Sequence, residues 1–182
     1  LNDTGRAQAS AFFKRYGHIS FDKIYTSTLK RTKESVAEFI ALGIPHEVHA
    51  GLNEISWGAN EGQKITPEED AYYHYILRRW EEGETSLRIN GGESPDEVAL
   101  RQQPVIHKIL NGKENTILVC MHGRAIRILL CQLLHYPLKS MDMFAHEILC
   151  LYLLEHTGTF CSVIKYNEVG HLEKISRPEI PA

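Results

Sequence analysis

The stretch "NTILVCMHGRAIRILL" constrains the fold of this chain more than any other. Apolar residues run without alternation from Ile117 to Met121, as is typical of a strand buried on both faces of a sheet. His122 and Gly123 follow at once, and apolar residues then recur at helical spacing. A buried strand that leads directly into a helix is the repeating unit of a parallel α/β sheet.

The rest of the chain repeats this alternation of strand and helix. The pattern predicts helices over 1–17 (capped near Asn2 and ending at Gly17), 28–43, 66–83 and 123–136, and a segment over 90–112 that begins as a turn and continues as a helix. It predicts strands over 21–27, 46–51, 115–122, 148–156 and 161–168. Pro104 is expected to kink or split its helix, and the tail 176–182 to fray. We therefore expect one three-layer α/β domain over 1–182, with a mainly parallel sheet covered by helices on both faces.

Composition excludes several classes of function. The net charge of -3 provides no basic field for nucleic acid. No apolar run reaches the roughly 18 residues that cross a bilayer, so no membrane partner is expected. The four cysteines form no CxxC pair, which favours reduced thiols and a cytoplasmic location. Leu1 is not a usual first residue, so the sequence does not decide whether a targeting segment once preceded it.

Polar residues follow two of the predicted strands. Ser27 and Arg31 come after one strand, and His122 ends another. Taken singly, each has an ordinary structural explanation, as does Glu54 in its loop. Because the carboxyl ends of parallel strands form the binding crevice of such sheets, we expect these groups to meet. An arginine, a histidine and the free N–H groups of a helix start suit a phosphate, and a nearby carboxyl group can protonate a leaving oxygen.

These residues also carry a family resemblance. The pattern SxLxR over Ser27–Arg31, "LNEISWGANEG" from Leu52, "GGES" from Gly91 and "HG" at 122–123 are similar to motifs of the histidine phosphatase superfamily, the phosphoglycerate mutase-like proteins. The opening "LNDTGRAQA" resembles the first helix of that family. Each motif alone is short, but their order and spacing agree from Leu1 to about His171.

The resemblance implies a phosphate ester substrate attacked by a histidine, which gives a phosphohistidine that water then cleaves. In this chain it implies that Arg31 holds the phosphoryl oxygens and that His122, with the helix start behind it, stabilises them. Gly123 would allow close backbone approach, and Ser27 would hold the Arg31 turn or touch the phosphate. Glu54 would protonate the leaving alcohol. No cofactor and no metal are implied.

Two departures from the family pattern stand out. The Arg-His-Gly triplet that carries the nucleophilic histidine of the family is absent, together with its strand. We expect about 25–30 further residues before Leu1, the size of one strand and its loop. The alternative is a chain that begins at Leu1 and is inactive or borrows a strand from another copy. The second departure is Ala145-His146-Glu147, which occupies a position that is often polar in relatives, so His146 or Glu147 could reach the rim of the pocket.

Three functions follow as hypotheses. The first is a phosphomonoesterase that hydrolyses small phosphorylated metabolites. The second is a cofactor-dependent phosphoglycerate mutase, which must shield its phosphohistidine from water and so favours longer covering segments than the short span between Glu61 and Gly91. The third is an inactive phospho-ligand-binding pseudoenzyme. The sequence identifies neither the physiological substrate nor the oligomeric state, for which a homodimer is one possibility.

Overall fold

The computed structural model describes residues 1–58 and 66–173, so Glu61 and the tail 176–182, which was expected to fray, lie outside the described residues. Three short strands form a parallel sheet in the order β2-β1-β3: β1 (Lys23–Thr26), β2 (His46–Val48) and β3 (Ile117–Cys120). Their register pairs Ile24 with His46 on one side and with Leu118 on the other. The parallel sheet predicted from the apolar runs is therefore confirmed.

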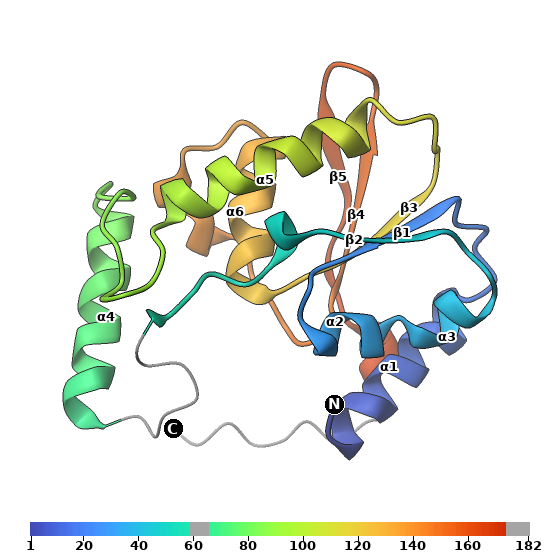
Figure 1. Ribbon diagram of the computed structural model, residues 1–182, viewed down its shortest axis with the longest axis horizontal. Helices are drawn as coiled ribbons and strands as arrows, with labels where there is room; N and C mark the ends of the chain where they lie inside the picture. Colours follow the sequence, from blue (N-terminus) through green and yellow to red (C-terminus); the bar gives the residue numbers. More distant parts are fainter. Residues whose placement is uncertain (59–65, 174–182) are drawn as a thin grey trace.

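Helices cover both faces of this sheet (Figure 1). On one face, Ile24 and Leu118 pack with Phe12 of α1 (Asp3–Tyr16) and Phe39 of α3 (Ala37–Ala41). On the other face, Tyr25 packs with residues of α5 (Pro95–Leu110) and of the short 3-10 helix η1 (Ala50–Leu52). The strand alternation of β1 thus separates two apolar clusters, because successive side chains point to opposite faces.

A third cluster lies beyond the sheet. It joins α6 (Gly123–Leu133) and α5 to α4 (Pro67–Glu81) and to the 3-10 helix η3 (Leu138–Met143). Trp80 of α4 is fully buried there, and its indole nitrogen donates to the carbonyl of Leu87. Trp80, next to the last residue of α4, is therefore a packing residue.

Local sequence signals explain where three of the described helices begin. The side chain of Asn2 caps α1, which ends at Gly17 as predicted. Thr66 and Ser94 form capping boxes at α4 and α5, and in each helix a proline occupies the first position.

One helix prediction was wrong, and one of the two outcomes expected at Pro104 does not occur. The expected helix over 28–43 is divided at Val36, which leaves α2 (Lys30–Ser35) and α3 as separate turns. Val36 has a φ of -115° and its side chain is buried, so packing of this residue overrides helical continuity. Pro104 does not split α5, since Leu100, whose carbonyl loses its N–H donor, lies on the exposed side where water can bond it.

The last two strands form a separate antiparallel hairpin of β4 (Leu151–His156) and β5 (Cys161–Glu168), followed by η4 (Gly170–Leu172). Leu151 at the start of β4 packs against the same apolar cluster as Cys120 at the end of β3. Within the described residues no strand pairs with β3 on the side away from β1. A search of those residues for a helix long and apolar enough to cross a membrane found none.

Candidate active site

The ends of β1 and β3 bring three of the predicted residues into direct contact. The Nε atom of Arg31 donates to Nδ1 of His122 across 3.0 Å, and Nε2 of His122 lies 2.8 Å from Oγ of Ser27. Ser27 and His122 are buried, whereas Arg31 is exposed. The parallel pairing of β1 with β3 explains this meeting, because both strands end at the same edge of the sheet.

The hydrogen bonds assign the protons around Ser27. Since Nδ1 of His122 accepts from Arg31, the proton of the neutral ring sits on Nε2 and is donated to Ser27. Ser27 Oγ also accepts from the backbone N–H of Leu29 and donates to Thr32 Oγ1, which in turn donates to the carbonyl of Leu29. These bonds use the one proton and both lone pairs of the Ser27 hydroxyl. The geometry favours a role in holding the Arg31 turn over direct contact with phosphate.

His122 is held as a neutral ring. Burial, together with the nearby positive charges of Arg31 and Arg101 and with His146, lowers its pKa to about 4. A neutral His122 can accept the Arg31 bond, which a protonated ring could not. An arriving phosphate dianion would act in the opposite direction and favour the charged ring.

Glu54 lies on the loop after η1 and reaches the first turn of α6. Its Oε1 accepts hydrogen bonds from the backbone N–H of Ala125 at 2.9 Å and from that of Ile55, the next residue, at 3.0 Å. Its Oε2 accepts from the backbone N–H of Arg124 at 3.2 Å. The N-cap residue of α6, His122, makes no capping bond with its side chain. A carboxylate from another part of the chain therefore caps this helix.

This arrangement modifies one expectation. The helix start was expected to present its free N–H groups to a phosphate, but two of those groups already bind Glu54. Glu54 is thereby fixed at the same edge as the Arg31–His122 pair. Asn53 strengthens the connection, since its Oδ1 accepts both the backbone N–H and the hydroxyl of Thr28 in the loop before α2.

Gly123 has a close neighbour that a larger residue would have to displace. A Cβ atom at this position would lie 2.9 Å from Cδ2 and 3.1 Å from Nε2 of His146. The imidazole of His146 is thus packed over the start of α6, with Nδ1 at 3.5 Å from Sγ of Cys150. Burial lowers the pKa of His146, so this ring is also predominantly neutral near pH 7. The expectation that His146 reaches the site is supported by this contact.

The arginines of α6 point to a separate cluster. Arg124 and Arg127 both bind Asp142 of η3, and the guanidinium of Arg124 lies over the ring of Trp80. Asp142 neutralises one of the two positive charges and the face of Trp80 receives the Arg124 guanidinium, so these contacts fix α6 to its neighbours. Within residues 1–58 and 66–173 no group of His, Cys, Asp and Glu side chains is arranged to hold a metal ion.

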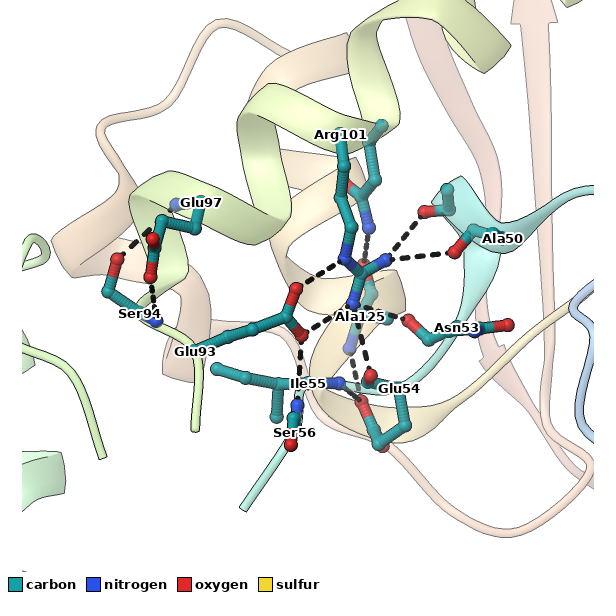
Figure 2. A network of polar contacts seen from close by, with 12 residues as sticks. Ala50, Asn53, Glu54, Ile55, Ser56, Glu93, Ser94, Glu97, Arg101 and Ala125 are labelled. Carbon is teal, nitrogen blue, oxygen red and sulfur yellow. Dashed lines mark hydrogen bonds and ion pairs between the residues drawn. The ribbon is translucent and has the colours of Figure 1, made fainter. Parts of the chain in front are cut away.

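The sequence predicted no role for Arg101, nor for Glu93 within the GGES motif. Arg101 binds both carboxylate oxygens of Glu93 and the carbonyls of the loop that carries Glu54 (Figure 2). One signal could have revealed it: Arg101 lies between Val98 and Val105 on the buried face of α5, where an arginine needs acceptors.

The chain belongs to the histidine phosphatase superfamily (branch 1), whose model matches residues 1–169. It is 35% identical over 136 residues to the 6-phosphofructo-2-kinase/fructose-2,6-bisphosphatase of Gallus gallus, covering 74% of this chain and 28% of that protein. It is 26% identical to a 2,3-bisphosphoglycerate-dependent phosphoglycerate mutase of Gloeobacter violaceus, covering 100% of this chain and 85% of the mutase. The chain thus spans only about a quarter of the length of the bifunctional relatives.

Solved structures confirm the fold. A mycobacterial glucosyl-3-phosphoglycerate phosphatase in complex with inorganic phosphate has a TM-score of 0.80 at 21% identity, covering 94% of this chain and 88% of its own. The α-ribazole phosphatase of Shigella flexneri has a TM-score of 0.79 at 21% identity, covering 92% and 84%. At this identity the likeness establishes the α/β architecture of the family.

Proposed function

We propose that the protein is a phosphomonoesterase that hydrolyses small phosphorylated metabolites through a phosphohistidine intermediate. The observation that carries the proposal is the juxtaposition of Arg31, His122 and Glu54 at one edge of the sheet. A guanidinium and an imidazole suit the phosphoryl oxygens, and a carboxyl group beside them suits the leaving oxygen. Family membership and the phosphatases among the relatives agree with this chemistry.

In the proposed reaction Arg31 binds the non-bridging oxygens through its Nη atoms, because its Nε is committed to His122. His122 and the N–H of Gly123 stabilise the charge that spreads over those oxygens. A histidine nitrogen forms a bond to phosphorus while the P–O bond to the alcohol breaks, and the proton of Glu54 passes to the departing oxygen. Water then attacks the phosphohistidine, returns a proton to Glu54 and releases inorganic phosphate.

We further propose that the nucleophilic histidine comes from a segment ahead of Leu1, on a strand that joins the sheet beside β3. Two features support this. β3 has no described strand partner on the side away from β1, and β4 begins in the same apolar cluster without pairing with β3. A strand between them would satisfy the backbone groups of both edges. The domain over 1–182 would then be completed by this strand.

The mutase remains the second candidate because one relative that covers the whole chain carries that activity in its name. Between the loop of Glu54 and the GGES motif, the described residues form one helix, α4, which is limited cover for a phosphohistidine. This favours hydrolysis.

A cytoplasmic location is supported by the four free cysteines, and the homodimer remains a prediction to be checked by sedimentation.

The full-length protein with a labelled phosphate ester tests these alternatives. Rapid acid-free quenching should trap label on a histidine, and product analysis should give inorganic phosphate and free alcohol. Failure to label any histidine would leave the phospho-ligand-binding pseudoenzyme as the better description. Transfer of label to 3-phosphoglycerate in the presence of a bisphosphoglycerate primer, without release of phosphate, would identify a mutase instead.

A further inference from the structure

Arg101 makes an unusually complete set of hydrogen bonds to one loop. Its Nη1 donates to the carbonyl of Gly51 at 2.8 Å, and its Nη2 donates to the carbonyls of Asn53 and Glu54, each at 3.0 Å. A longer bond of 3.4 Å reaches the carbonyl of Ala50. One side chain from α5 therefore holds the backbone of the whole turn that ends at Glu54 (Figure 2).

Glu93 completes the attachment from the other side. Its two carboxylate oxygens accept from Nε and Nη2 of Arg101 at 2.8 and 3.0 Å, and Oε2 also accepts the backbone N–H of Ser56 at 2.9 Å. Burial acts to raise the pKa of Glu93, but the bonds from Arg101 and Ser56 outweigh it, so the pKa is lowered and Glu93 stays ionised. The segment 50–56 is thus bound at its first part by Arg101 and at its end by Glu93.

The backbone itself is pressed against α5 at this point. A Cβ atom added to Gly51 would lie 2.6 Å from the carbonyl oxygen of Arg101 and 2.7 Å from Cγ2 of Val105. The contact of Gly51 with α5 therefore sets how closely the backbone of the turn approaches this helix. Together with the guanidinium bonds, this contact determines where the carboxylate of Glu54 meets the first turn of α6.

Arg101 is poorly suited to bind substrate directly. Its five N–H groups face Glu93 and the four carbonyls already named, and the charge of the guanidinium is balanced by Glu93. An arginine whose N–H donors are all used in this way affects the reaction through the group that it holds in place.

We propose that Arg101 and Glu93 are positioning residues that set the Glu54 carboxyl group in the geometry needed to protonate the leaving oxygen. This inference rests on the proposed phosphatase function. A small displacement of an acid from its hydrogen-bonding position costs about 100-fold in the step that it assists, and leaves steps that do not need a proton nearly unchanged.

The test compares Arg101→Lys with Arg88→Lys in the full-length protein. Both are arginines paired with a glutamate, but Arg88 is largely exposed and binds only Glu97 among the described residues. Arg101→Lys keeps the charge and loses the planar set of donors. We expect it to lower kcat/KM for an alkyl phosphate by about 30- to 100-fold and for p-nitrophenyl phosphate by less than about 3-fold, since the aryl oxygen leaves without a proton. Arg88→Lys should change neither.

Two further variants separate positioning from folding. Gly51→Ala displaces the same turn without touching a charge, and should reproduce the selective loss on the alkyl ester. The double variant Arg101→Lys/Glu54→Gln should be no slower on the alkyl ester than Glu54→Gln alone, because both act through one group. Equal losses on both esters, or additive losses in the double variant, would overturn the inference.

A readout independent of turnover keeps the inference distinct from the proposed function. Amide hydrogen exchange at Arg124 and Ala125 reports the Glu54 cap, and we expect it to accelerate both in Arg101→Lys and in Glu54→Gln. An inactive wild type would refute the phosphatase and with it the catalytic role of Arg101. Unchanged exchange at both amides in Arg101→Lys would refute positioning even in an active enzyme.

Discussion

The guanidinium Nε of Arg31 donates to Nδ1 of His122 across 3.0 Å, although the two residues are separated by 91 positions in the sequence. This bond joins an exposed cation to a buried, neutral imidazole at the carboxyl edge of the parallel sheet. Because Arg31 is exposed, a ligand can reach its side chain from solvent. The pair is the central element of the proposed site.

Removal of the Arg31 side chain tests the phosphate-binding role. Arg31→Ala should lower kcat/KM for every phosphate ester by about 100-fold or more, because a charged donor to the developing oxyanion is lost. Lys30→Ala is the matched control, since Lys30 precedes it, is 88% exposed and pairs only with Glu34 among the described residues. Steady-state kinetics on both variants decide the matter, and wild-type turnover in Arg31→Ala would remove Arg31 from the site.

Glu54→Gln separates the two roles of the Glu54 carboxyl group. Loss of the acid should slow alkyl phosphates by about 100-fold and aryl phosphates far less, because only the alkyl oxygen needs a proton to depart. The substitution also exchanges one acceptor for a donor at the α6 amides, so a small loss of stability is expected. Glu38→Gln, at an exposed position of α3, serves as control. Identical slowing of both ester classes would argue against Glu54 as the acid.

The depressed pKa of His122 predicts a pH dependence of stability. In the unfolded chain a histidine titrates near pH 6.5, whereas His122 in the fold titrates near 4. Between these values the unfolded state binds more protons, so stability falls as the pH is lowered through this window and is fully retained above it. At pH 4 the free energy of unfolding is therefore lower by about 3 kcal/mol than it is above this window.

Urea unfolding of wild type and His122→Asn at pH 7 and at pH 4.5 measures this contribution. Other histidines with lowered pKa values, such as His46 and His171, affect both proteins alike and cancel in the difference. The wild type should therefore lose more stability on acidification than the variant. Parallel pH profiles for the two proteins would mean that His122 is not held neutral by the fold.

Gly123 and His146 form a pair that a double-mutant cycle can examine. Gly123→Ala places a methyl group 2.9 Å from the His146 ring, so the ring must shift, at a cost of about 1–3 kcal/mol for overpacking. His146→Ala opens the space, and the double variant should recover most of the loss. Thermal or urea unfolding of the four proteins gives the coupling. Strictly additive losses would show that the two positions do not compete for space.

Much of the fold and part of the site followed from local patterns. The apolar runs of β1 and β3 and the caps at Asn2 and Gly17 predicted elements that the structure contains. The meeting of Ser27, Arg31 and His122 also followed, because parallel strands that end at one edge bring their next residues together. These predictions rest on short-range chemistry and one rule of topology.

The remaining features depend on contacts that no local pattern encodes. The break at Val36 arises from packing against the sheet, and the cap of α6 comes from Glu54, far away in the sequence. A histidine at the N-cap position leaves a helix without its usual acceptor, so a distant carboxylate could have been anticipated. The identity of that carboxylate, and of Arg101 as its support, required the three-dimensional arrangement.

The hairpin of β4 and β5 hydrogen-bonds within itself and leaves the parallel sheet intact. His146, which packs over Gly123, lies on the segment that leads into this hairpin. Changes to that segment can therefore alter the surroundings of Gly123 while β1 and β3, whose ends position Ser27 and His122, stay in register. If His146 borders the proposed site, substitutions ahead of β4 would change which ligands fit there without disturbing the contacts among Ser27, Arg31 and His122.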